Sequence, residues 1–112
     1  MFYNPTKTIM AKLTLAVNPT FPVTVNVPKA GDSAVTLKLT CKHRTRAQLD
    51  EFIKSRSDKE DVTSILDMAT GWDLDDAFNA ENIDLMCQNY IAAPLEIYRA
   101  YIDQLVGAKV KN

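Results

Sequence analysis

The chain has 112 residues, of which 46% are apolar and 24% charged, with thirteen basic residues against fourteen acidic ones. This length predicts a single domain over residues 1–112. The near-neutral charge argues against a nucleic-acid partner, because a broad phosphate-binding surface needs an excess of Lys and Arg. No apolar run reaches the roughly 20 residues of a membrane-spanning helix, so we expect no membrane partner either.

The N-terminal residues 1–12 have no hydrophobic period, and we expect them to be flexible. Met10-Ala11-Lys12 has the form of a natural start, so we interpret residues 1–9 either as an upstream extension or as residues added to the natural chain. Lys7 and Lys12 interrupt any apolar core of an export signal, which favours a cytoplasmic protein.

Two stretches, 21–27 and 35–41, alternate apolar and polar residues and are rich in β-branched side chains. Each predicts a strand with one buried face and one wet face. Turn residues between them, including Gly31, indicate a hairpin within residues 13–44. Pro22 lacks a backbone donor, so we expect the first strand to lie at a sheet edge.

Residues 45–112 form the predicted helical part. Thr45 and Gln48 match a capping box for a helix that ends near Ser55. A second box at Ser57-Asp-Lys-Glu60 begins another helix, and its apolar residues continue to Ala69. Gly71 is expected to end this helix as a left-handed cap.

Two more helices are predicted in the last third of the chain, with Asn79 as an N-cap, Pro94 in a first turn and Gly107 as the final stop. Their apolar stripes are Ile83, Met86, Cys87 and Tyr90, and then Leu95, Tyr98, Tyr101, Ile102 and Leu105. Strands followed by helices indicate an α+β fold: a small N-terminal antiparallel hairpin or sheet with about four helices packed on one face.

The residues that could carry chemistry are few. His43 and Cys41 share a strand face, but two ligands do not make a metal site, and we interpret His43 as a histidine at the core edge. Asp73, Asp75 and Asp76 begin like a calcium loop whose remaining ligands are absent, so we interpret them as a solvated turn. The basic cluster Lys42–Arg46 is interpreted as a solvated strand end, with an acidic partner as the alternative. Neither Cys41 nor Cys87 has neighbours that would activate a thiol. We therefore predict no enzyme, no cofactor and no metal.

The aromatic side of the last two helices is the remaining candidate. Core packing is one interpretation, since helical aromatic stripes usually face inward. The other is a patch that takes a partner helix, because apolar residues there exceed what a small sheet can cover. The candidate partner-binding residues are Trp72, Phe78, Tyr90, Tyr98 and Tyr101.

Several fragments, taken in order, resemble the tail assembly chaperones of long-tailed bacteriophages. The resemblance covers residues 10–112, and each fragment is short. The fragments are Met10-Ala-Lys-Leu-Thr-Leu15, Phe21 in an early strand, Lys42-His-Arg-Thr45, Gly71-Trp72, Phe78-Asn-Ala-Glu-Asn-Ile83, Pro94, Tyr98-Arg-Ala-Tyr101 and Lys111-Asn112.

This resemblance implies a non-enzymatic protein of phage or prophage origin that acts in the host bacterial cytoplasm and is absent from the mature virion. Its expected partners are the tape-measure protein, whose apolar helical segments it would keep soluble, and the tail-tube protein, which it would help to recruit. Self-association and a frameshifted longer form are also features of such chaperones. The alternatives are a structural tail component, such as a tube-end or joining protein, and a small adaptor domain.

Overall fold

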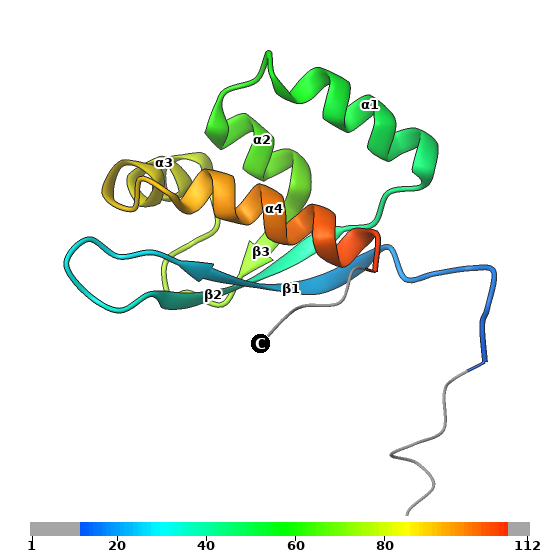
Figure 1. Cartoon of the computed structure of the whole chain (residues 1–112), viewed down its shortest axis with the longest axis horizontal. Coiled ribbons are helices and arrows are strands. Elements are labelled where there is room, and N and C mark those ends of the chain that lie inside the picture. The colour runs from blue at the N-terminus through cyan, green and yellow to red at the C-terminus, as the bar shows by residue number, and fades with distance from the viewer. Residues whose placement is uncertain (1–11, 108–112) are drawn as a thin grey trace, which may run out of the picture.

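The computed structural model describes residues 12–107. Within them the order of elements is β1 (Thr20–Val27), β2 (Val35–Lys42), α1 (Arg46–Arg56), α2 (Asp61–Met68), β3 (Ala69–Trp72), α3 (Ala80–Asn89) and α4 (Ala93–Leu105). The strands form an antiparallel sheet in the order β1-β2-β3, and the helices lie on one side of it (Figure 1). The predicted α+β class is confirmed. The expectation of a flexible N-terminus falls on residues that, apart from Lys12, lie outside the described range.

The predicted hairpin is confirmed to within one residue at each strand end. Val23 lies opposite Leu39 and Val25 opposite Leu37, and all four side chains are buried beneath the helices. The intervening residues of both strands are exposed on the open face of the sheet. Gly31 in the connecting turn has φ +72°, a conformation that residues with a Cβ rarely adopt.

Pro22 lies on an edge strand, as predicted. The backbone N–H of His43 donates to the carbonyl of Pro19 (2.8 Å), which continues the β1–β2 ladder at odd-numbered residues of β1. Backbone groups of even-numbered residues therefore point away from β2. The missing N–H of Pro22 consequently costs the sheet no hydrogen bond, and it interrupts the free edge where another chain would otherwise pair.

The prediction that Gly71 caps a helix is wrong, because Gly71 lies in the short strand β3 and its φ is not positive. Trp72 pairs with Leu39 and Gly71 with Thr40, while Thr70 is an extra, bulged residue in the ladder. A β-branched residue and an aromatic residue flank this glycine, and both favour extended backbone. The second edge of β2 also has backbone groups that need partners, and β3 supplies them.

Of the two predicted capping boxes, one is confirmed. The N–H of Gln48 donates to Oγ1 of Thr45 (3.2 Å), and the N–H of Thr45 donates to Oε1 of Gln48 (2.9 Å). The second box is wrong, since α2 starts after Glu60, which makes no side-chain cap. Ser57 instead ends α1, and the N–H of Lys59 donates to the carbonyl of Arg56 (3.0 Å) in the turn between the helices. Ser57 to Lys59 therefore belong to the turn between α1 and α2, and they are not available as the first residues of a longer α2.

The predicted boundaries of the last two helices are confirmed. Oδ1 of Asn79 accepts from the N–H of Asn82 (2.9 Å), Pro94 lies in the first turn of α4, and Gly107 has φ +77° after its end. Each of these signals acts over no more than four residues of sequence. Tertiary packing left the local conformations that they favour unchanged.

Side chains from all seven elements form one hydrophobic core, with Tyr101, Ile97, Ile83 and Ile65 fully buried. Burying one such side chain stabilises the fold by roughly 1.5–3 kcal/mol. The prediction for Leu95 is wrong, because it is 46% exposed. Ile97 takes the core position instead, and residues two apart on a helix lie about 200° apart around its axis.

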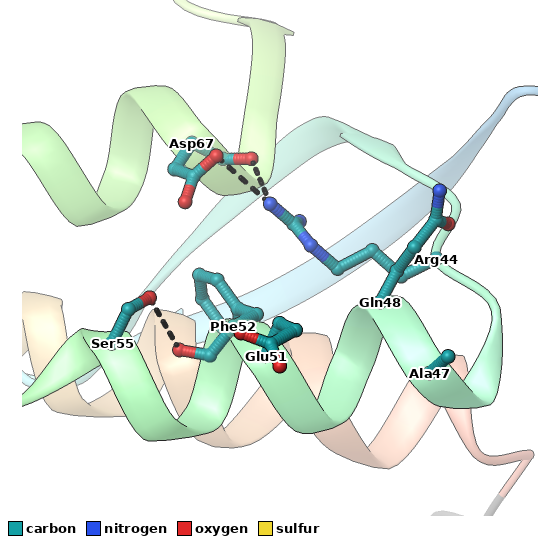
Figure 2. Close-up of a pocket in the computed structure, with 7 residues that line it drawn as sticks. All are labelled: Arg44, Ala47, Gln48, Glu51, Phe52, Ser55 and Asp67. Carbon is teal, nitrogen blue, oxygen red and sulfur yellow. Dashed lines mark hydrogen bonds and ion pairs between the residues drawn. The ribbon is translucent and has the colours of Figure 1, made fainter.

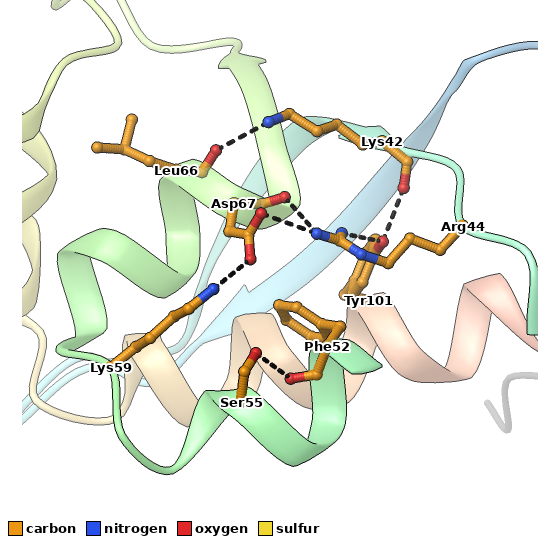
Figure 3. A network of polar contacts seen from close by, with 8 residues as sticks. All are labelled: Lys42, Arg44, Phe52, Ser55, Lys59, Leu66, Asp67 and Tyr101. Atoms are coloured by element: carbon orange, nitrogen blue, oxygen red, sulfur yellow. Dashed lines mark hydrogen bonds and ion pairs between the residues drawn. The ribbon is translucent and has the colours of Figure 1, made fainter. Parts of the chain in front are cut away.

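A polar network joins the end of β2 to α2 and α4 (Figure 3). Nη2 of Arg44 donates to Oδ1 of Asp67 (2.8 Å), and Nη1 donates to the hydroxyl of Tyr101 (2.8 Å). That hydroxyl donates in turn to the carbonyl of Lys42 (2.7 Å), and Nζ of Lys59 donates to Oδ2 of Asp67 (2.8 Å). Three segments far apart in the sequence, the end of β2, α2 and α4, are thereby fixed around one guanidinium.

The interpretation of Lys42–Arg46 as a solvated strand end is wrong for its central residue. The side chain of Arg44 is only 13% exposed, and its guanidinium carbon lies 4.3 Å from the centre of the Phe52 ring. Nζ of Lys42 also turns inward and donates to the carbonyl of Leu66 (3.2 Å). Arg44 is buried only because Asp67 and an aromatic face balance its charge.

Asp67 is the acidic centre of this network. Burial alone would raise its pKa, but the hydrogen bond from Lys59 and the charges of Arg44 and Lys59 outweigh burial, so the pKa of Asp67 lies below its usual value. The ionised form therefore stabilises the folded chain.

We predict that Tyr101→Phe lowers the free energy of unfolding by about 1–3 kcal/mol, because it leaves the carbonyl of Lys42 and a guanidinium N–H without partners. Urea denaturation measures the loss. Tyr98→Phe is the matched control, since the hydroxyl of Tyr98 makes no hydrogen bond within residues 12–107 and its removal should change stability little. Equal losses in the two variants would contradict the assignment.

We also predict a pH dependence of stability. The stabilisation from Asp67 is fully present above its unfolded-state pKa of about 3.9 and is lost as the pH falls through the lower folded-state pKa. The difference in unfolding free energy between the wild type and Asp67→Asn should therefore shrink on acidification below about pH 4. Denaturation at several pH values checks this; a difference that stays constant or grows at low pH would refute it.

Candidate partner-binding surface

A groove runs along α3. It encloses about 270 Å³ and is lined by Trp72, Leu74, Asp76, Asn82, Leu85, Met86, Asn89 and Tyr90. A second hollow of about 120 Å³ lies against the end of the hairpin, lined by Val27, Val35, Thr36 and Leu37. The two hollows share the side chains of Leu74, Met86 and Tyr90. We call this continuous surface the α3 groove.

Short-range contacts hold one wall of the groove in place. The indole N–H of Trp72 donates to the carbonyl of Asp76 (2.7 Å), and the Trp72 and Phe78 rings meet edge to face with centroids 5.2 Å apart. The N–H of Asp73 donates to the carbonyl of Lys38 (3.1 Å), and Oδ1 of Asp73 accepts from the N–H of Lys38 (3.0 Å). The loop after β3 is therefore fixed at both ends, and it presents Leu74 with 41% of its surface exposed.

Three of the five aromatic residues singled out in the sequence come together here. Trp72 and Tyr90 line the α3 groove, and Phe78 supports Trp72 from the side. All three are half-buried and also pack against the core. Each of these aromatic residues therefore contributes both to the core and to the groove wall. The two interpretations from the sequence, core packing and a partner-binding patch, do not exclude each other.

The remaining two aromatic residues lie elsewhere. Tyr101 is fully buried, with its ring centroid 5.7 Å from that of Phe52 and 6.0 Å from that of Phe21. Tyr98 is half-buried beneath Arg56, whose guanidinium carbon lies 3.7 Å from the Tyr98 ring centre. The structure thus separates Tyr98 and Tyr101 from the groove, and Tyr101 presents no surface that a partner could contact.

The residues that the sequence did not single out are aliphatic. Five large apolar side chains are exposed along the groove and just beyond it, in the turn after α3 and the first turn of α4: Val35 (40%), Leu74 (41%), Leu85 (58%), Ile91 (88%) and Leu95 (46%). The expected apolar surplus therefore exists, but aliphatic residues make up most of it. In the sequence, the position of Leu74 between two acidic residues could have indicated an exposed apolar side chain here.

Another hollow, of about 410 Å³, lies between α1 and α2 (Figure 2). It is lined by Arg44, Ala47, Gln48, Glu51, Phe52, Ser55 and Asp67. Its two most buried charges are paired with each other, and the hydroxyl of Ser55 donates to the carbonyl of Phe52 (3.2 Å). The exposed carboxylate of Glu51 is the one charged group of this lining that forms no ion pair within residues 12–107, and a single exposed carboxylate does not make a binding site.

The thiols are not poised for chemistry. Burial raises the pKa of Cys41 to about 12. Burial first, and then the charges of Asp61 and Asp84, raise the pKa of Cys87 to about 11. Both thiols are therefore protonated at neutral pH and are poor nucleophiles.

Within residues 12–107 no three His, Cys, Asp or Glu side chains are grouped so that they would hold a metal ion. His43 is half-buried in a hollow of about 280 Å³ where the chain enters β1, and Phe21 and Leu105 also line this hollow. No helix in the same range is both long and apolar enough to cross a membrane.

The comparisons with known proteins agree with the resemblance seen in the sequence. A family model described as phage tail assembly chaperone matches residues 10–112. No curated protein and no solved structure matches the chain. The match covers nearly the whole chain, and on this evidence the chain belongs to the phage tail assembly chaperone family.

Proposed function

We propose that the chain binds an apolar helical segment of the tape-measure protein in the α3 groove and keeps that protein soluble until the tail is built. In this proposal it also helps to recruit tail-tube protein, acts in the host bacterial cytoplasm and is absent from the mature virion. Family membership supports the chaperone role, and the geometry of the groove supports the choice of surface.

The observation that carries the proposal is the exposure of large aliphatic side chains on neighbouring elements. Leu85 on α3, Leu74 on the loop and Val35 at the hairpin end are each at least 40% exposed around the shared groove. Contiguous apolar patches on soluble proteins mark binding surfaces, and an amphipathic helix is a common occupant of an apolar groove beside another helix.

The groove is largely preformed. Its walls are a helix, the end of a β-hairpin and a loop held by the Trp72 indole N–H and by the two backbone contacts of Asp73 with Lys38. A surface that needs little ordering on binding loses less conformational entropy, so more of the apolar contact appears as affinity. This suits a holding function that must act without energy input.

A second partner would need a second surface. The face of the sheet opposite the helices is polar and exposed, with Thr24 and Asn26 on β1 and Thr36, Lys38 and Thr40 on β2. It stays free when the α3 groove is filled. We assign recruitment of tail-tube protein to this open face, because interfaces that are not permanent are about as polar as the rest of a protein surface.

The groove assignment predicts that Leu85→Gln weakens binding of a tape-measure segment by about tenfold or more, since a fully buried Leu contributes roughly 1.5–3 kcal/mol. Leu74→Ser should act in the same direction. Titration of a labelled tape-measure segment measures the affinity, and the soluble fraction of co-expressed tape-measure protein measures the holding activity.

Ile53→Gln on α1 is the matched control, because Ile53 is also exposed (44%) but lies outside the α3 groove. Circular dichroism establishes that all variants are folded. A tape-measure protein whose solubility is the same with the wild type, with Leu85→Gln and with no added chain would refute the proposed function. Detection of the chain in purified virions would favour a structural tail component instead.

A further inference from the structure

Charge is distributed unevenly along the chain. Residues 61–98 contain eight acidic residues and no Lys, Arg or His: Asp61, Asp67, Asp73, Asp75, Asp76, Glu81, Asp84 and Glu96. This segment supplies all of the α3 groove except its hairpin side. A net charge near zero for the whole chain thus conceals an acidic segment, and this segment includes most of the groove.

Several of these carboxylates lie at the rim. Asp76 lines the groove directly, and Asp75 is its exposed neighbour in the same loop. Glu81 is exposed on α3 one turn before Leu85, and residues four apart on a helix lie on the same side. The apolar floor is therefore bordered by negative charge on the loop side and on the helix side.

Among residues 12–107, the nearby basic residues do not neutralise this rim. Lys29 in the hairpin turn lies 3.9 Å from Asp32, with which it forms an ion pair. Lys38 belongs to the residues of β2 that face the open side of the sheet. Lys59 is bound to Asp67 within the buried network. The rim charge is consequently available to a ligand.

We infer that the α3 groove selects an amphipathic helix whose apolar stripe is flanked by Lys or Arg. This inference rests on the proposed function, because it names the kind of segment that the groove holds. The aliphatic floor supplies affinity, while the acidic rim speeds association and disfavours acidic helices. Because the rim is exposed, salt screens its contribution.

A competing occupant is an N-terminal segment of a second copy, in which Leu13 and Leu15 are 87% and 98% exposed. Within residues 12–17 this segment carries one charge, Lys12, and Leu13 to Val17 form no helix but bend at Leu15 and Ala16. One cation matches a rim of several carboxylates less well than a helix with cations along both flanks. We therefore assign the groove to a basic helix.

Two designed helical peptides test this, with the same leucine stripe and with either Lys or Glu at the flanking positions. Fluorescence anisotropy with the full chain should show binding of the Lys peptide that is at least about tenfold tighter at low salt. The preference should shrink at about 0.5 M salt, where the Debye length falls to a few ångströms.

The double variant Asp76→Asn/Glu81→Gln should reduce the preference about threefold to tenfold without preventing binding through the leucine stripe. The matched control Asp50→Asn/Glu51→Gln removes two exposed carboxylates from α1 and should leave the preference unchanged.

Equal binding of the two peptides, or no binding of either, would overturn the inference. The effect of Leu85→Gln on the solubility of tape-measure protein is measured separately, so failure of the proposed function is distinguishable.

Self-association is the last outcome. If sedimentation shows an oligomer that Leu85→Gln and Leu15→Ser each dissociate, the groove belongs to the N-terminal segment of a second copy and the inference is overturned. If the chain sediments without such an oligomer and the Lys peptide binds, the inference is supported.

Discussion

The small size of the sheet is the constraint on which the rest of the structure depends. Three strands offer one apolar face, and α4 and α2 occupy it with Ile97, Tyr101, Ile65 and Met68. The helix α3 packs against α2 and α4 instead, at the end of the sheet where the hairpin turns (Figure 1). Only Ile83 of α3 is fully buried, so the opposite side of this helix keeps apolar residues that no other part of residues 12–107 covers.

The Arg44 network stabilises the fold at one end of the molecule, and the α3 groove offers a binding surface at the other end. At one end, the guanidinium joins the end of β2 to α2 and α4, and its charge is paired with the carboxylate of Asp67. At the other end, the charges border an apolar surface and have no partner of opposite sign in the groove wall. A holding protein gains from this arrangement, because a rigid body can present a surface that binds partners without itself depending on them.

Local sequence signals predicted most of the fold. The alternation in β1 and β2, the Thr45 box, the Asn79 cap and the Gly107 stop each act over a few residues, and the structure confirms them. The errors occurred where distant residues decide the conformation. Gly71 became part of β3 because β2 had a second edge to pair, and Arg44 was buried because Asp67, 23 residues later, lies beside it.

The candidate site was also predicted only in part, because only some of its residues are close to one another in the sequence. Trp72, Phe78 and Tyr90 follow one another closely in the sequence, and the structure brings them together. Tyr98 and Tyr101 also lie on an apolar helix stripe, but in the structure they pack against the chain's own core. Periodicity alone cannot tell whether such a stripe faces its own sheet or a partner. The aliphatic floor depends on Val35 meeting Leu74 and Met86 across the end of the hairpin, a contact without a local signal.

The most direct test of this account is to map a bound tape-measure segment on the full chain by amide chemical-shift changes in NMR spectra. The account predicts that the largest changes fall on residues 72–95 and on Val35 and its neighbours in β2, while α1 and the open face of the sheet stay nearly unchanged. Changes concentrated on α1 or on the open face, with α3 unaffected, would contradict it.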